Sequence, residues 1–472
     1  MRMLKTTTKL LIAGFFTFTA VLSCKKSTDE LAATPPATIA PTSTPTPVAV
    51  NPDAVKDSIL MYTKNLYLWN TQIPASFNAR SYADPEKLME AFQPFSMETG
   101  FSQAVDRWSF AMKKVEWDQQ SAGMSNLFSD ASTSAGDFGI SVFFRAEGDL
   151  RVRLVEPNSP AGVAGIKRGW RITSINGSTN ITTANANTIV DAVYYATQTA
   201  FKFTKPDGVE VTNTLNAGHY ADKPVYLDTV YNLPSQRVGY LVYNSFLGKQ
   251  ADVSAEFSRV FSRFASAQVT DVVIDLRYNG GGYVSLAEQL ANYLAPASAT
   301  GGVMMKQVYN AENASNNTTT YFNKRGTLNL PDVYFLVSKS SASASELVIN
   351  TLKPYMDVKV FGPSATHGKP VGFFPIPVGD WYIFPVSFRT TNKNGEGSYF
   401  NGLSVNTQAA DGLDKDWGDV TENLLATALR NISGTGYGSA REESFTPQSA
   451  QTIAGNKKLD EPFLKVSIGK RP

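Results

Sequence analysis

Five serines lie within thirteen residues of this chain, in the stretch SKSSASASELVIN at 338–350. The stretch follows an apolar, strand-like segment and leads into a segment with helical periodicity. A serine hydroxyl becomes an effective nucleophile only when a neighbouring group accepts its proton. These serines are therefore candidates for acyl transfer, and the base that would serve them has to lie elsewhere in the chain.

Two further stretches contain residue types that suit such a reaction. DLRYNGGGY at 275–283 has three glycines after an apolar strand, where the backbone can approach a substrate without a Cβ atom in the way. HGKPVG at 367–372 has a lysine among glycines, and a neutral lysine can accept a proton. Each stretch alone is also explained by structure, because glycines form tight connections, serines cap helices and loop lysines are usually solvated.

An alternation of strands and helices is expected to position these stretches. RVGYLVYN at 237–244 predicts a strand, a recurring apolar face over 253–264 predicts a helix, and DVVIDL at 271–276 predicts a buried strand. This βαβ unit indicates a layered α/β domain over residues 225–435. Further predicted elements are a strand at 332–338, a helix at 344–356, a single antiparallel strand at 380–390 and a closing helix at 420–432.

Two smaller units precede this domain. Residues 53–128 repeat apolar side chains at intervals of three and four, which predicts a small helical N-terminal domain. Residues 136–216 alternate apolar and polar side chains, which predicts a compact β-rich module. The fold class expected for the chain is therefore multidomain α+β. Residues 436–472 are expected to form a polar tail.

The first residues are typical of a secretory signal, with a basic region followed by an apolar run too short to span a membrane. VLSC at 21–24 resembles the lipobox of a bacterial lipoprotein, which predicts a signal peptide at 1–23 and lipidation of Cys24. The Pro- and Thr-rich residues 24–52 then predict an extended tether. The alternative is an ordinary cleaved signal with an incidental cysteine.

Composition excludes several classes of function. The chain has 43 basic and 41 acidic residues, and this balance does not favour nucleic acid or an anionic surface as a partner. Its single cysteine excludes an internal disulfide, and with only two histidines no Cys/His zinc site is available. We expect no metal and no cofactor.

The order and surroundings of DLRYNGGGY, SASASE at 341–346 and HGKPVG resemble the C-terminal processing proteases, the S41 family of serine peptidases. The chain is similar to the lipoprotein members of Bacteroidetes-type bacteria. The resemblance implies a helical N-terminal domain, a PDZ domain and a protease core of the ClpP/crotonase type. NSPAGVAGIKRGWRITSING at 158–177 resembles the PDZ signature, with Trp170 where bacterial members usually have aspartate.

The S41 family uses a Ser-Lys dyad, so the resemblance implies Ser343 as nucleophile and Lys369 as base. Free lysine titrates near 10.4, and a base that works near neutral pH needs a pKa lower by about 3 units. The oxyanion of the acyl-transfer intermediate needs N–H donors. We expect the N–H of Ala344 to be one donor, and the family places the second at Gly281 or Gly282.

Two departures from the family weaken this mapping. The spacing from Ser343 to Lys369 is one residue longer than in better-known members, and Phe373 stands where they have a glutamine that orients the lysine. His367 is an alternative base, and His219 a weaker one. Apolar surroundings that would lower the pKa of the lysine are expected from Val371, Phe373 and Phe374.

The neighbouring polar side chains are expected to have structural roles. Ser341 and Ser345 should cap or pack, Glu346 should bond the start of its own helix, and Asp275 and Asn279 should fix the glycine-rich loop.

In the PDZ resemblance, a loop before the second strand offers N–H groups to the terminal carboxylate of a peptide, which then adds as an extra strand. The residues of this peptide-binding loop are Phe138, Gly139, Ile140 and Ser141. The leading hypothesis is thus a serine endopeptidase of the cell envelope, an outer-membrane lipoprotein that faces the periplasm or the cell surface. Its expected partners are protein or peptide substrates with free C-termini. The alternatives are a binding protein for peptides or lipids that has lost catalysis, and a scaffold that retains its ligand intact.

Overall fold

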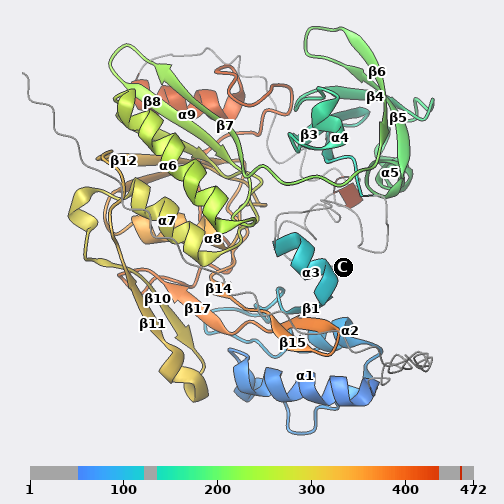
Figure 1. Ribbon diagram of the computed structural model, residues 1–472, viewed down its shortest axis with the longest axis vertical. Helices are drawn as coiled ribbons and strands as arrows, with labels where there is room; N and C mark the ends of the chain where they lie inside the picture. Colours follow the sequence, from blue (N-terminus) through green and yellow to red (C-terminus); the bar gives the residue numbers. More distant parts are fainter. Residues whose placement is uncertain (1–50, 122–135, 435–455, 457, 460–472) are drawn as a thin grey trace, which may run out of the picture. The chain divides into compact units, whose positions relative to one another are not determined.

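A computed structural model of the chain describes residues 51–121, 136–434, 456 and 458–459 (Figure 1). The predicted signal peptide, the lipidation site Cys24 and nearly all of the tether lie outside these residues, as does most of the predicted polar tail. Within the described part of the chain, no helix has the length and apolar character needed to cross a membrane.

A six-stranded sheet forms the centre of residues 225–435. Its strand order is β18-β13-β12-β9-β8-β7, and all neighbours are parallel except β7 and β8. Val272, Val273 and Ile274 of β9 are all fully buried, because a parallel sheet is covered on both faces. The strands are β7 (Val225–Asn232), β8 (Arg237–Tyr243), β9 (Asp271–Asp275), β12 (Asp332–Leu336), β13 (Asp357–Gly362) and β18 (Thr407–Gln408).

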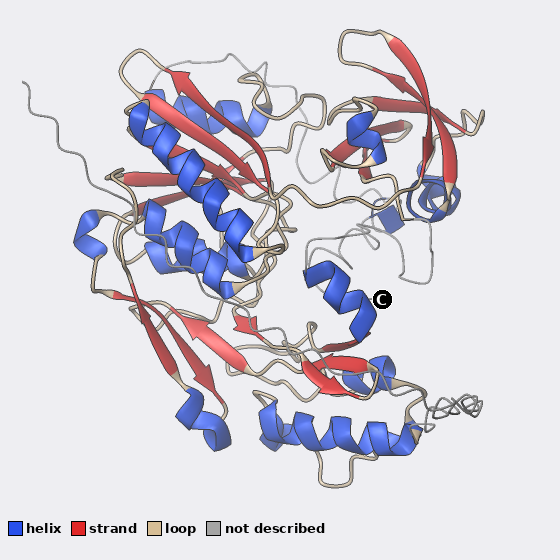
Figure 2. Cartoon of the chain, viewed as in Figure 1, coloured by secondary structure: helices blue, strands red, loops and turns tan. Residues whose placement is uncertain are grey.

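Four helices cover the two faces of this sheet. Three of them pack in one apolar cluster with Leu241, Val272 and Val333, whereas the fourth packs with Tyr240 and Val273 on the opposite face. The helices are α6 (Gln250–Ser266), α7 (Val284–Leu294) and α8 (Ala344–Leu352) on the first face and α9 (Asn423–Ser433) on the second. The predicted mixed α/β fold is therefore confirmed, with helices and strands in the predicted order (Figure 2).

Two small sheets flank the central one. One has the order β11-β10-β17-β14 and the other the order β1-β16-β15. Their elements are β1 (Phe110–Lys113), β10 (Val303–Tyr309), β11 (Thr318–Tyr321), β14 (Val371–Gly372), β15 (Ile376–Val378), β16 (Trp381–Phe384) and β17 (Phe388–Thr391), with 3₁₀ turns η5 (Ala297–Ala299) and η6 (Ala311–Asn316).

The prediction of a single strand at 380–390 is wrong, because β16 and β17 belong to different sheets. Pro385 lies between them, and proline has no N–H to donate to a strand ladder. The next N–H, that of Val386, donates to Ser109 Oγ at 3.0 Å instead of to a neighbouring strand. The chain therefore changes sheets at the proline.

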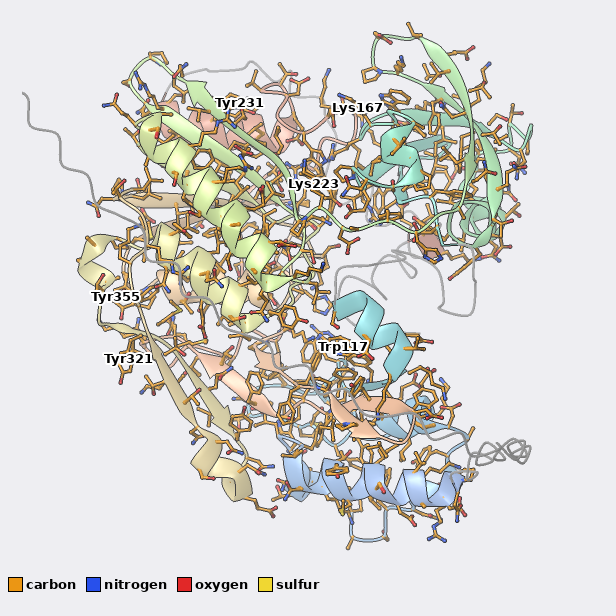
Figure 3. All side chains as sticks on the ribbon, viewed as in Figure 1. Trp117, Lys167, Lys223, Tyr231, Tyr321 and Tyr355 are labelled. Atoms are coloured by element: carbon orange, nitrogen blue, oxygen red, sulfur yellow. The ribbon has the colours of Figure 1, made fainter. Side chains whose placement is uncertain are left out.

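The N-terminal part is not helical throughout, which corrects the prediction for residues 53–128. Its helices are α1 (Pro52–Leu66), α2 (Pro85–Glu90) and α3 (Lys114–Ser121), with 3₁₀ turns η1 (Asn70–Gln72) and η2 (Ala79–Ser81). Strand β1 pairs with β16, so Phe110 lies opposite Phe384. Trp117 of α3 also packs on Phe384, with ring centroids 4.6 Å apart (Figure 3). This part is thus joined to residues 225–435 by a shared sheet.

Residues 140–216 form an antiparallel sheet of order β2-β3-β4-β5-β6, in which β2 is an edge strand. Pro160 is the first residue of a short helix capped by Ser159, and Asn176 (φ 49°) and Gly177 (φ 81°) form a tight turn. The elements of this five-stranded module are β2 (Ile140–Ala146), β3 (Asp149–Val155), α4 (Pro160–Val163), β4 (Arg171–Ile175), η3 (Thr183–Asn185), α5 (Ala186–Val190), η4 (Asp191–Tyr195, a π-helical turn), β5 (Gln198–Thr204) and β6 (Glu210–Asn216).

Candidate active site

The serine-rich stretch forms the turn between β12 and α8, and its hydroxyls differ in what they bind. Ser341 Oγ donates to Leu276 O at 2.7 Å, and Ser345 Oγ donates to Asn279 O at 2.9 Å. These two serines tie the turn to the loop after β9. Among the described contacts, the Oγ of Ser343 donates no hydrogen bond to that loop.

Ser343 has an unusual backbone conformation. Its φ of 55° and ψ of −112° lie outside the regions that most residues with a side chain adopt. Only Asn176 and Gln268 share a positive φ among the described residues other than glycine. Such strain costs roughly 1–3 kcal/mol, persists only where surrounding contacts enforce it, and clusters at functional sites. Ser343 is therefore held in a strained, half-buried position at the start of a helix.

Lys369 lies in a loop that is fixed by the side chain of Glu346. Glu346 Oε1 accepts from Gly368 N at 2.6 Å and from Thr366 Oγ1 at 2.5 Å. Glu346 Oε2 accepts from Lys369 N at 2.8 Å and from Ser343 N at 2.9 Å. One carboxylate thus bonds the backbone of both proposed catalytic residues, and Glu346 itself is completely buried.

The surroundings of Lys369 favour its neutral form. Burial lowers the pKa of Lys369 to about 7, although the carboxylates of Asp106 and Glu346 oppose this shift. The side chain is only 5% exposed, and Nζ lies 4.0 Å from the centroid of the Phe373 ring. Phe373 therefore occupies the space beside the amine.

Of the other two expected apolar neighbours, Val371 is buried and Phe374 is 36% exposed. Phe374 is thus more exposed than Val371, and its expected contribution beside Lys369 stays a prediction.

Ser343 and Lys369 are brought into one region by Glu346, but their side chains form no hydrogen bond with each other among the described contacts. In unliganded enzymes, hydrogen bonds between catalytic groups are often long and form only when substrate binds. The site therefore has a buried amine with a lowered pKa and a strained serine, and needs a side-chain movement to connect them.

The predicted oxyanion donors differ in availability. Gly281 N donates to Asn279 Oδ1 at 2.9 Å, so this N–H is already used by the structure. The N–H groups of Ala344 and Gly282 have no acceptor among the described residues. A Cβ atom at Gly281 would lie 2.8 Å from Ser343 Cβ and 3.0 Å from Ala344 N. Gly281 thus provides space beside Ser343 rather than a free donor.

His367 is not suited to be the base. Its Nε2 accepts from Trp108 Nε1 at 3.0 Å. Burial, helped by the cationic side chains of Arg107 and Lys369, lowers the pKa of His367 to about 3. The ring is consequently neutral, and one of its nitrogens is already bonded.

The predicted peptide-binding loop is also partly occupied. Gly139 N donates to Asp137 Oδ1 at 2.7 Å, and Ser141 Oγ accepts from Arg153. Phe138 and Ile140 are buried in the core of the five-stranded module. The N–H of Gly139 is therefore not offered to a ligand, contrary to expectation, because Asp137, two residues earlier, accepts its hydrogen bond.

Sequence reasoning missed two features of this region. It assigned Glu346 to its own helix, whereas the carboxylate also binds the loop of Lys369. It also gave no sign of a buried ionic network in which Arg277 Nη1 bonds Asp411 at 2.7 Å and Glu422 at 3.0 Å. The signal that could have revealed it is DLR at 275–277, where two charged residues directly follow a buried apolar strand.

Comparison with known proteins places this geometry in context. Residues 237–405 match the sequence profile of Peptidase family S41. A protein named "Probable CtpA-like serine protease" from Staphylococcus saprophyticus is 29% identical over 246 residues, which are 50% of this chain and 45% of that protein. A protein of the same name from Staphylococcus aureus strain bovine RF122 is 28% identical over 240 residues, with the same coverage. The match spans about half the length of these curated relatives.

The fold is similar to a crystal structure described as "Putative S41 protease" from Bacteroides fragilis. That chain is 24% identical, with a TM-score of 0.65, and the match covers 80% of this chain and 97% of the other. At this identity the likeness establishes the fold. The family match and the relatives named as serine proteases support a serine-type peptidase.

Proposed function

We propose that this chain is a serine endopeptidase that cleaves proteins or peptides through a Ser343–Lys369 dyad. The observation that carries the proposal is the pairing of a strained serine with a buried lysine whose pKa is lowered to about 7, both bonded through their backbones to Glu346. Backbone strain and a buried amine each cost stability, and such features cluster at functional sites.

The reaction follows from these residues. Neutral Lys369 takes the proton of Ser343 Oγ, and the oxygen attacks the scissile carbonyl carbon. The N–H groups of Ala344 and Gly282 stabilise the oxyanion that forms. When the intermediate collapses, Lys369 gives the proton to the leaving amine and an acyl-enzyme remains. Water, deprotonated by the same lysine, then releases the acyl product and restores the serine.

A second candidate function is a protein that binds peptides or lipids on the same fold and no longer cleaves. It is favoured by the absence of a Ser343–Lys369 hydrogen bond among the described contacts and by the bonded N–H of Gly281. Turnover separates the two candidates, because a binding protein leaves its ligand intact.

The five-stranded module supports a further part of the proposal, the capture of substrate C-termini by strand addition to the edge strand β2 in the manner of PDZ domains. The N–H of Gly139 does not take part in this capture, because it is bonded to Asp137. The membrane location is proposed from the sequence of the first 24 residues, with Cys24 as the lipidated residue of an envelope lipoprotein. The substrates are therefore proposed to be polypeptides of the cell envelope or its surroundings, with the lipid anchor as the contact to the membrane.

The experiment that tests the peptidase is time-resolved cleavage of casein by the wild-type chain and by the Ser343→Ala and Lys369→Ala variants. We expect cleavage by the wild type and a loss of at least 1000-fold in both variants, since each removes one partner of the proton transfer. Ser340→Ala is the matched control, because Ser340 lies in the same turn and its hydroxyl has no hydrogen bond among the described contacts. Binding of casein without cleavage by any chain would favour the binding protein.

A further inference from the structure

The edge of strand β2 that faces away from β3 is hydrogen-bonded to other parts of the chain. Among the strands of the described residues, β2 pairs with β3 alone, so the backbone groups on its other side need partners from outside the sheet. Phe144 N donates to Asn456 Oδ1 at 2.7 Å, and Asn456 Nδ2 donates to Phe144 O at 2.8 Å. A side chain 312 residues further along the sequence therefore reproduces the pair of hydrogen bonds that an added strand would make.

The residues around Asn456 are seated on the same module. Asn456 is 1% exposed and Leu459 is fully buried within the apolar cluster of the module, together with Ile140, Val142 and others. Lys458 is exposed between them. We call Asn456, Lys458 and Leu459 the docking segment. Asn456 hydrogen-bonds the backbone at the edge of β2, and Leu459 is buried in the apolar cluster. A specific ligand of a strand edge is expected to make both kinds of contact.

The same strand edge is blocked at a second position. Val142 N donates to the hydroxyl of Tyr194 at 3.1 Å, and Tyr194 belongs to the turn η4 that follows α5. Val142 and Phe144 are two residues apart, so their N–H groups point to the same side of the strand. A peptide that paired with β2 would have to displace both Tyr194 and the docking segment.

We propose that the docking segment is an intramolecular ligand of the β2 edge and competes there with peptides that add to this strand. The proposal rests on the proposed capture of peptides by the module, and it identifies the occupant that such peptides must displace. A segment of the same chain is present at an effective concentration of about millimolar, so weak external peptides would be excluded and only strongly bound ones would enter.

The test uses the full chain with Ser343→Ala, so that no probe is cleaved. The probe is a fluorescein-labelled synthetic peptide of residues 452–463, and its affinity is measured by fluorescence anisotropy. Asn456→Ala in the chain should increase the affinity for the probe at least tenfold, because the internal competitor has lost both hydrogen bonds. Lys458→Ala is the matched control in the same segment and should leave the affinity unchanged.

Hydrogen exchange gives a second readout that needs no peptide. The amide of Phe144 should exchange at least tenfold faster in the Asn456→Ala chain than in the Lys458→Ala chain. Equal exchange rates would overturn the docking, and equal probe affinities, including no binding to any chain, would overturn the competition. Since the chain in this test lacks the nucleophile, its outcome is independent of whether casein is cleaved.

Discussion

The side chain of Glu346 connects the turn that contains Ser343 with the loop that contains Lys369. Its four hydrogen bonds go to Ser343 and to the loop 366–369 that contains Lys369, so the carboxylate fixes the distance between the two backbones. Burial raises the pKa of Glu346, and the bonds from Thr366, Lys369, Gly368 and Ser343 act against this shift. A carboxylate that accepts four bonds is a rigid support, which catalysis needs more than binding does.

Phe373 is the side chain beside the Lys369 amine, at the position where the family resemblance implies a glutamine. A glutamine would orient the lysine by a hydrogen bond, whereas an aromatic ring 4.0 Å from Nζ excludes water from the amine. The ring face also attracts a cation, so it does not by itself lower the pKa. The low pKa of Lys369 therefore comes from burial, and Phe373 contributes to that burial.

The pH dependence of cleavage should report the titration of Lys369. Below pH 7 the amine is protonated and cannot accept a proton from Ser343, so kcat/KM for casein should fall about tenfold per pH unit. As pH rises through about 7, the neutral form is populated and kcat/KM should reach a plateau. The measurement is a profile of initial rates between pH 5 and 9.

His367 cannot produce the same profile, because its pKa is lowered to about 3 and it is neutral throughout this range. A profile that is flat between pH 5 and 9 in an active chain would contradict a lysine base. A circular dichroism spectrum at each pH controls for unfolding.

At the scale of elements, the site arises where two neighbouring parallel strands end. β9 and β12 are paired in parallel, so the loops at their carboxyl ends lie side by side. The first loop contains Gly281 and the second contains Ser343. In open α/β sheets, ligand sites occur at this edge.

Gly281→Ala should reduce kcat strongly and leave the fold intact. The new Cβ would lie 2.8 Å from Ser343 Cβ and 2.9 Å from Ala342 O, so the turn that contains Ala342 and Ser343 must shift. We expect a loss of at least 100-fold in kcat for casein, since small displacements of reacting groups have effects of this size.

Gly301→Ala is the matched control for this prediction. Gly301 also has a positive φ, of 79° against 104° for Gly281, but a Cβ atom there would meet nothing within 4 Å. Both variants place a side chain in an unfavourable backbone conformation, but only Gly281→Ala brings a new atom close to Ser343. Equal kcat values in the two variants would show that the space beside Ser343 is not used in catalysis.

The parts of the fold that were predictable from sequence are those with local periodicity. The α6 helix and the β8 and β9 strands were evident because burial selects apolar residues at fixed intervals. Pairing between distant segments leaves no such pattern. The contact of β1 with β16 and the bonds of Asn456 to Phe144 were therefore not foreseen. Ser343 and Lys369 were chosen by family resemblance, and that choice stays a prediction.

At the scale of the molecule, a buried ionic network joins the five-stranded module to the central domain. Arg168 of the module donates to Asp411, to Gly412 O at 2.9 Å and to Lys415 O at 2.7 Å. Asp411 also accepts from Arg277 at 2.7 Å. Burial raises the pKa of Asp411, but the two arginines outweigh it and hold this pKa below its usual range. Within this buried network, the two arginines therefore neutralise the charge of Asp411, and Asp411 in turn compensates theirs.

Arg168→Ala should destabilise the chain through this contact. Removing one partner of a buried ion pair leaves an uncompensated charge and costs about 3–5 kcal/mol in the free energy of unfolding. Lys167 is the matched control, because it also faces the central domain, at 3.4 Å from Asp416, but its side chain is 64% exposed (Figure 3). Lys167→Ala should cost less than about 1 kcal/mol.

Urea unfolding followed by tryptophan fluorescence measures both variants, since Trp417 lies under the Arg168 guanidinium at 4.7 Å from its ring centroid. If the network couples the module to the domain, Arg168→Ala should also split the unfolding curve into two transitions, because the module loses the hydrogen bonds of Arg168 to Asp411, Gly412 and Lys415. A single transition with equal midpoints for Arg168→Ala and Lys167→Ala would show that the two parts are held together by their other contacts, the apolar ones and the hydrogen bond from the Tyr226 hydroxyl to Glu156. The position of the five-stranded module, and with it the edge of β2, would then depend on those remaining contacts and not on Arg168.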